Sequence, residues 1–314
     1  MIESSSIKKR IDYFDLMKGV CIILVILHHC DVLHSDMLRC IRMPLYFMLS
    51  GMFFKKYSGF LDFTIRKINR LLIPYGAFML LCFCIFHRIN VPLWFLISLF
   101  YSYILYYIIE KYLLDRYDSW YLKIVLFVVV SLIAYCLSFV HINNKLTNIV
   151  LRYFVISLST IPYFFFSQTL RRKGILSKNY SDIFLIVVGI VGAAICYFSS
   201  VHSINYRKAL FEAYPLYYVS AIGGVSAIWA LCYKIKKIPY ISYMGRYSII
   251  VLVTHFPIAM TMKELNIDKW IITIVILILS PLLIYVMKRY TPHITAQKDI
   301  IQYNKDTRKI RFVW

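Results

Sequence analysis

The sequence predicts an all-α polytopic membrane protein with about ten transmembrane helices and both termini in the cytoplasm. Three observations support this fold class. Only 16% of the 314 residues are charged and 61% are hydrophobic, whereas soluble proteins are usually about 25% charged. The apolar residues form separate stretches with nearly the length of a bilayer crossing. The basic residues between these stretches are distributed unequally over the two sides.

Ten apolar stretches approach the roughly 20 residues that a helix needs to cross the hydrocarbon core of a bilayer. They are residues 16–34, 41–56, 70–88, 92–110, 121–141, 149–170, 182–200, 214–233, 246–262 and 269–290. The second stretch is short and contains Pro44 and Gly51, so we expect it to be broken or partly re-entrant. The sixth contains Arg152, which is an unusual residue within a membrane span.

The distribution of lysine and arginine predicts the orientation. If the N-terminus is inside, the cytoplasmic loops carry roughly three times as many basic residues as the opposite loops, to which Arg39 and Arg42 are assigned. We therefore expect one membrane domain over residues 1–290 and a short basic cytoplasmic tail over residues 291–314. The expected location is the cell membrane, which in a bacterium would be the inner membrane.

The net charge of +21 would indicate a nucleic-acid partner in a soluble protein. In this chain the basic residues lie next to the apolar stretches, where they would set the topology and bind anionic lipid headgroups. We therefore expect membrane lipids as partners and no nucleic acid.

Most of the eight cysteines lie within apolar stretches, where a thiol usually packs as a small hydrophobic group. Cys30 and Cys40 flank the first loop. They could form a disulfide if that loop faces an oxidising compartment.

Ionisable residues within membrane spans are costly, so each of them is a functional candidate. They occur at four places: Lys18 with His28 and His29 in the first stretch, His87 at the end of the third, Arg152 in the sixth, and His255 in the ninth. Lys18 and His29 are eleven residues apart, about 16 Å along a helix. The first stretch could therefore hold a site with a cation at one end and a histidine at the other.

Two other interpretations of the first stretch stay open at this point. Lys18 could extend to the inner headgroups while the histidines mark the outer boundary of the span. Alternatively, Cys30, Asp31 and His34 lie at helical spacings that would let two or three metal ligands converge. A structural zinc site needs four ligands and a catalytic site three. No other short cluster supplies the remainder, so no metal is expected.

Six short motifs follow one another along the chain. They are DLMKG (15–19) followed by His29, MPLYFMLSG (43–51), RLLIPY (70–75), LWFL (93–96), IPYFFF (161–166), and GRYS (245–248) followed by His255. In this order and at these spacings they resemble the motifs of the membrane-bound acyltransferase 3 family. Lys18 and Lys67 stand where the family pattern has arginine, and both changes keep the positive charge. In this the chain resembles the smaller sugar O-acetyltransferases that lack a fused extracytoplasmic domain.

The resemblance implies the reaction. An O-acyltransferase of this kind moves an acyl group, usually acetyl, from cytoplasmic acyl-CoA to a hydroxyl of an extracytoplasmic or lipid-linked glycan. The expected donor is acetyl-CoA and the expected acceptor is such a saccharide. His29 would act as general base or as covalent acyl carrier, with Lys18 and Asp15 as further catalytic residues.

The resemblance also implies the binding residues. Lys18, Lys67 and Arg70 would bind the CoA phosphates, because phosphate groups favour charge-assisted hydrogen bonds. Trp94 could stack on the adenine or on a sugar ring. Ser50 and His255 are the residues expected to bind the acceptor.

Two other functions are compatible with the pattern. A transporter or flippase of a lipid-linked sugar would also have many spans and buried ionisable groups, but the sequence lacks a clear inverted repeat. A structural or sensory membrane protein could use histidines that titrate near neutral pH. It would not depend on acyl-CoA.

Overall fold

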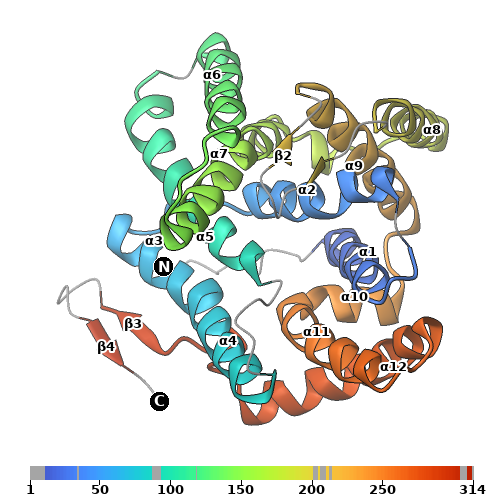
Figure 1. The fold of residues 1–314 in the computed structure, drawn as a ribbon. Helices are drawn as coiled ribbons and strands as arrows, with labels where there is room; N and C mark the ends of the chain where they lie inside the picture. The colour runs from blue at the N-terminus through green and yellow to red at the C-terminus, as the bar shows by residue number, and fades with distance from the viewer. Residues whose placement is uncertain are drawn as a thin grey trace, which may run out of the picture.

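The computed structural model describes residues 11–33, 35–86, 93–117, 119–200, 204–205, 210–211, 214–304 and 310–312. Over these ranges the protein is almost entirely helical (Figure 1). The helices are α1 (Asp12–His29), α2 (Asp36–Met52), α3 (Phe60–Lys67), α4 (Ile73–Phe86), α5 (Trp94–Ile109), α6 (Trp120–Ser138), α7 (Lys145–Arg172), α8 (Asp182–Ser199), α9 (Leu216–Ile235), α10 (Pro239–Arg246), α11 (Ser248–Glu264) and α12 (Lys269–Tyr290).

Shorter elements complete the described chain. Two π-helical segments are η1 (Ile68–Leu72), which joins α3 to α4, and η2 (Glu110–Leu114), which continues α5; η3 (Ile175–Ser177) is a single 3₁₀ turn. Two small antiparallel sheets pair β1 (Ile204–Asn205) with β2 (Leu210–Phe211) and β3 (Ile301–Tyr303) with β4 (Ile310–Phe312).

Each of the ten predicted apolar stretches overlaps a helix. Among the described residues, six helical segments are long and apolar enough to cross a membrane. One is Phe60–Ile85, which contains α3, η1 and α4 up to Ile85, and the others lie in the helices α6, α7, α8, α9 and α12. The all-α membrane class is therefore confirmed. Ten spans and two cytoplasmic termini stay predictions.

The break expected in the second apolar stretch is absent, because α2 is one continuous helix through Pro44. Proline removes one backbone hydrogen bond, and the contacts of α2 with α1, α7 and α9 hold the remaining turns. Among the described residues, which include all eight cysteines, every thiol is free, so Cys30 and Cys40 form no disulfide. Both are buried and pack as hydrophobic side chains.

α1 and α2 lie in the centre of the bundle, with the helix pairs α6–α7, α8–α9 and α11–α12 around them (Figure 1). α1 packs very closely against α10. A Cβ on Gly19 would lie 2.1 Å from the carbonyl oxygen of Ile241, and a Cβ on Gly245 would lie 1.9 Å from that of Asp15. Only glycine allows this approach, as is common where membrane helices cross. The crossing fixes α1 beside the chain segment that leads into α11.

Candidate functional site

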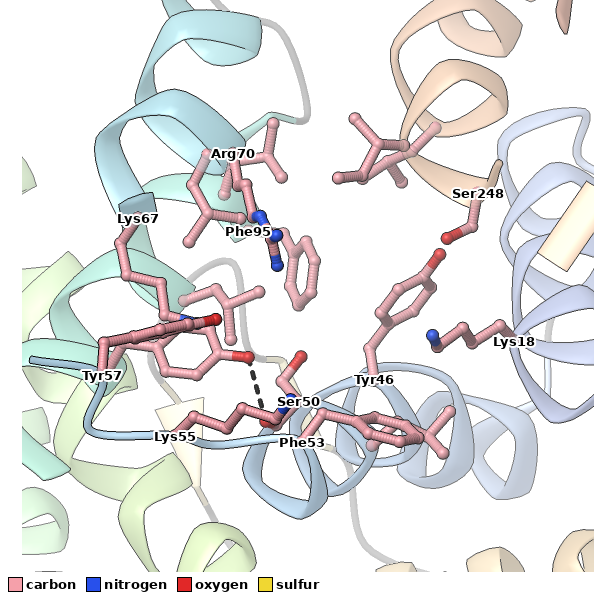
Figure 2. Close-up of a pocket in the computed structure, with 17 residues that line it drawn as sticks. Lys18, Tyr46, Ser50, Phe53, Lys55, Tyr57, Lys67, Arg70, Phe95 and Ser248 are labelled. Atoms are coloured by element: carbon pink, nitrogen blue, oxygen red, sulfur yellow. Dashed lines mark hydrogen bonds between the residues drawn. The ribbon is translucent and has the colours of Figure 1, made fainter. Parts of the chain in front are cut away.

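A cavity of about 390 Å³ lies between α1, α2, η1, α5 and α11 (Figure 2). Four of its lining residues are basic: Lys18, Lys55, Lys67 and Arg70. Among the described residues that line it, none is acidic. The other lining residues are mainly aromatic and aliphatic. Lys67 is buried and Lys18 is half-buried, whereas Lys55 and Arg70 are exposed; together the four positive charges favour an anionic ligand.

Lys67 is the deepest of these cations. It is 5% exposed, and its ammonium nitrogen lies 3.4 Å from the ring centroid of Tyr103 and 5.4 Å from that of Phe63. Cation–π attraction of this kind offsets part of the cost of removing the ammonium from water. The Tyr103 hydroxyl donates a hydrogen bond to the carbonyl oxygen of Ser50 at 2.9 Å. Tyr103 therefore fixes Lys67 and the C-terminal end of α2 together.

Lys18 enters the cavity from the opposite side. It projects from α1 toward the cavity, while Lys67 and Arg70 approach from the α3–η1 segment (Figure 2). Its ammonium nitrogen is 4.9 Å from the ring centroid of Phe53, the residue that follows α2. Cations from two segments far apart in the sequence thus face one space, although no local pattern would place them together.

The last carbonyl groups of α2 are bound by side chains from neighbouring helices. Besides the bond from Tyr103 to Ser50, Gln168 donates to the carbonyl oxygen of Gly51, and Arg171 donates to that of Met52 at 2.7 Å. The last carbonyl groups of a helix lack the usual partner one turn further on, although the Gly51 carbonyl also accepts from the backbone N–H of Phe54 at 3.0 Å. With its carbonyls satisfied, the end of α2 is held rigidly, and the Ser50 side chain points into the cavity (Figure 2).

Asn69 fixes the segment that carries Lys67 and Arg70. Its side chain, 1% exposed, donates to the carbonyl oxygen of Ile301 at 2.7 Å and accepts from the backbone N–H groups of Ile300 and Ile301 at 2.9 and 3.0 Å. The predicted basic tail (residues 291–314) therefore also packs against the helical domain. Its strand β3 is attached to η1, and π-helical turns of this kind occur frequently at functional sites.

Two histidines form a second group at the far end of α1. The ring centroids of His29 and His255 are 5.3 Å apart, and the ring of Phe256 contacts His29 edge-on at 5.5 Å. The Nδ1 atom of His255 is 2.9 Å from the carbonyl oxygen of Val251. A carbonyl can only accept, so Nδ1 carries a proton, and Nε2 of the neutral ring is an acceptor. Nε2 is buried and has no hydrogen-bond partner among the described residues.

Charged groups surround this histidine pair. Asp31, just beyond α1, forms an ion pair with Lys263 near the end of α11, which joins the two helices that carry the histidines. Lys263 and Arg42 are both electrostatic neighbours of His29. Arg42 lies in α2 and is only 7% exposed.

The cavity and the histidine pair lie on the same helices. His29 and Lys18 are both on α1, about 16 Å apart along its axis. On α11 the lining residue Leu252 precedes His255 by three residues, a rise of about 5 Å. Neither histidine lines the cavity itself. The site therefore has two parts, a basic cavity and a histidine pair, which α1 and α11 connect.

The predicted site residues divide accordingly. Lys18, Ser50, Lys67 and Arg70 meet in the cavity, and His29 and His255 meet in the pair. Trp94 and Asp15 belong to neither group. The neighbour of Trp94, Phe95, lines the cavity, with the two rings 6.4 Å apart, and Asp15 is buried where α1 contacts α10. His34 and His87 lie outside the described residues.

Three residues at the site were not predicted from the sequence: Arg42, Tyr46 and Tyr103. Arg42 was assigned to a loop, but α2 begins at Asp36, so Arg42 lies inside the helix and inside the protein. A charge six residues after a helix start is a signal that could have found it. The two tyrosines gave no signal, because aromatic residues are frequent along the whole chain.

Residues 11–289 match a family model described as an acyltransferase domain, that of the acyltransferase 3 family. The match covers nearly the whole described chain and both parts of the site. Neither the comparison with curated proteins nor the comparison with solved structures finds a match.

Proposed function

This chain belongs to the acyltransferase 3 family and is a membrane acyltransferase; we propose that it transfers an acetyl group from cytoplasmic acetyl-CoA to a hydroxyl of an extracytoplasmic or lipid-linked glycan. In a bacterium the enzyme would act in the inner membrane. A transporter without chemistry is not favoured, because family membership supports acyl transfer.

The observation that carries this proposal is the basic cavity beside a histidine pair. CoA is polyanionic, and Lys18, Lys67 and Arg70 offer charge-assisted hydrogen bonds to phosphate from two sides of one space. The cavity volume of about 390 Å³ is within the usual range for small-molecule sites. It is suited to the phosphate-bearing part of the donor, with the acyl arm extending between α1, α2 and α11 toward the histidines.

His29 is the proposed base. The acceptor hydroxyl would lose its proton to the imidazole while its oxygen forms a bond to the thioester carbonyl carbon. The C–S bond then breaks, CoA leaves as a thiolate, and the proton on His29 passes to the sulfur. In a covalent variant of the mechanism, the imidazole itself accepts the acyl group before the hydroxyl does. His255 would orient His29 or the acceptor hydroxyl through its free Nε2 atom.

The test is transfer of labelled acetyl from acetyl-CoA in membranes from cells that express the chain and make surface glycans. We expect His29→Ala to lower the rate of labelling of the glycan fraction by about 100-fold or more. His28→Ala is the matched control, because it removes the neighbouring imidazole, whose ring centroid lies 5.2 Å from that of His29, and His28 has no proposed role; labelling should persist. Equal labelling by wild type and His29→Ala would remove His29 from the mechanism.

A further inference from the structure

Arg42 is a buried cation that the basic cavity does not use. It lies in the second turn of α2, is 7% exposed, and is absent from the cavity lining. Burying an arginine in a membrane protein is costly, so such a residue usually serves a site or a partner. The described part of the chain offers its guanidinium no carboxylate and no hydrogen-bond acceptor. Its electrostatic neighbours there are Cys21, Arg39 and His29.

The register of α1 and α2 places this guanidinium between the two parts of the site. The Cys21 thiol donates to the backbone carbonyl of Arg42 at 3.0 Å, and Lys18 lies against Phe53, so the two helices run antiparallel. Side chains lean toward the N-terminus of their own helix. Arg42 therefore leans toward the end of α1 that carries His29, while His29 leans back toward Arg42.

Arg42 also continues the wall of the cavity. Tyr46, which lines the cavity, follows Arg42 by four residues and so lies on the same face of α2, one turn away. The Tyr46 hydroxyl is buried and faces the Ser248 hydroxyl (Figure 2), and Nε2 of His255 is buried without a hydrogen-bond partner among the described residues. Along α2, Arg42 thus lies between the cavity residue Tyr46 and the end of the helix that is nearest to His29.

We propose that Arg42 is a further catalytic residue that binds the oxyanion formed on the thioester carbonyl during acyl transfer. This inference rests on the proposed function. When the acceptor oxygen bonds to the carbonyl carbon and its proton passes to His29, the carbonyl π electrons move onto oxygen. The negative oxygen is bound by the guanidinium, and the charge returns to form C=O as the C–S bond breaks and the thiolate takes the proton. Donors fixed before the reaction are effective at this step.

The position of Arg42 favours the acyl carbonyl over an anionic group of the acceptor. It lies on the cavity side of His29, where the donor's acyl arm would arrive. An acceptor glycan from the opposite face would meet the end of α1 and the Asp31–Lys263 ion pair first. The buried guanidinium therefore faces the group that becomes negative, not the group that supplies the hydroxyl.

The experiment measures the rate of labelled acetyl transfer to the glycan fraction as a function of acetyl-CoA concentration, and the Kd for CoA of the purified protein. For Arg42→Gln we expect kcat to fall about 100- to 1000-fold, with KM for acetyl-CoA and Kd for CoA within twofold of wild type. Arg39→Gln, on the preceding turn of α2, is the matched control and should keep its kcat. Added guanidinium ion should restore part of the activity of Arg42→Ala.

Other results would distinguish a failure of the Arg42 role from a failure of the proposed function. An active wild type with an equally active Arg42→Gln variant would overturn the role of Arg42 alone. A raised KM or Kd with unchanged kcat would assign Arg42 to donor binding and would also overturn it. A wild type that transfers no label would overturn the proposed function together with this inference. If Arg42→Gln binds no CoA because it fails to fold, Arg42→Lys is the variant that tests the proposal. It keeps the positive charge but loses the planar donor geometry, so kcat should fall while the Kd for CoA is unchanged. An unchanged kcat would contradict the proposal.

Discussion

Lys67 shows how a single buried cation can be kept for a ligand. The ammonium lies over the Tyr103 ring at 3.4 Å, and Tyr103 is itself fixed by its hydrogen bond to Ser50. Ring contact compensates only part of the desolvation cost. The part of the desolvation cost that is not offset makes Lys67 a weak contributor to the stability of the fold. An anionic ligand would offset that part, so the ammonium is a strong binding site for an anion.

Replacing Lys67 by methionine should separate binding from stability. The variant keeps the packing of the side chain but loses the charge, so we expect KM for acetyl-CoA to rise about 10- to 100-fold, which corresponds to a lost charge-assisted hydrogen bond of about 1.5–3 kcal/mol. The free energy of unfolding should be unchanged or higher, because no buried charge remains. Initial rates and thermal unfolding in detergent measure the two effects.

Arg66→Met is the control for this pair of measurements. Arg66 is the preceding residue, but it forms an ion pair with Asp62 and lies outside the cavity lining. Its replacement should leave KM nearly unchanged. An equal rise of KM in both variants would indicate a general effect of positive charge on this surface rather than a phosphate site at Lys67.

At the scale of elements, the crossing of α1 and α10 decides where the two parts of the site meet. α1 carries Lys18 and His29, and the residues after α10 begin α11, which carries Ser248 and His255. The backbone contact at Gly19 and Gly245 leaves no room for a side chain. The GRYS motif, suggested by resemblance alone, therefore has a structural explanation: its glycine permits the helix contact, and its serine lines the cavity.

Substituting alanine for Gly245 should destabilise the protein through this contact. The added Cβ would lie 1.9 Å from the Asp15 carbonyl oxygen, and forcing backbones apart typically costs about 1–3 kcal/mol. We expect a lower midpoint of thermal unfolding and reduced acyl transfer, since α1 and α11 would shift against each other.

Gly76→Ala provides the contrast. No atom lies within 4 Å of a Cβ at this position in α4, and alanine favours a helix over glycine by about 0.5–1 kcal/mol. The midpoint should therefore stay constant or rise. If both substitutions lowered the midpoint equally, close packing at Gly245 would not be the cause.

At the scale of the whole molecule, four of the helices that build the site, α1, α2, α5 and α11, are shorter or more polar than the segments that are suited to lipid, whereas the Phe60–Ile85 segment, which carries Lys67 and Arg70, is one of those segments. α2, α5 and α11 have 17, 16 and 17 residues, and α1 carries Asp12, Asp15 and Lys18. None of the four is among the six segments that are long and apolar enough to cross a membrane by themselves. Ionisable functional residues make these four helices costly to expose to lipid, and the surrounding apolar helices shield them from it.

The prediction of ten spans has a direct consequence for topology. An even number of crossings requires both termini on the same side, and the basic loops predict the cytoplasmic side. Tags at the two ends should both be accessible to protease in inside-out vesicles and protected in right-side-out vesicles. Tags found on opposite sides would show that one of the short helices, α1, α2, α5 or α11, does not cross the membrane.

Much of the fold and part of the site could be predicted from the sequence. The ten apolar stretches overlap helices, and Lys18, Lys67, Arg70, Ser50, His29 and His255 all lie in the two parts of the site. Predictions from local pattern alone were less successful. Pro44 suggested a broken helix and Arg42 a loop residue, because neither pattern reports the contacts that surround it. Trp94 matched a motif, but its neighbour Phe95 lines the cavity.

The sequence by itself determined that this is a helical membrane protein, where its helices lie, and which ionisable residues are candidates for chemistry. These properties depend on local backbone hydrogen bonds and on composition, because a membrane span must satisfy its own backbone. Only the tertiary structure decided which candidates meet: Lys18 with Lys67 across the cavity, His29 with His255, and Arg42 beside them. In lipid both the outward and the packed face of a helix are apolar, so hydropathy does not reveal which faces contact each other. Close packing at small residues such as Gly19 and Gly245 does that.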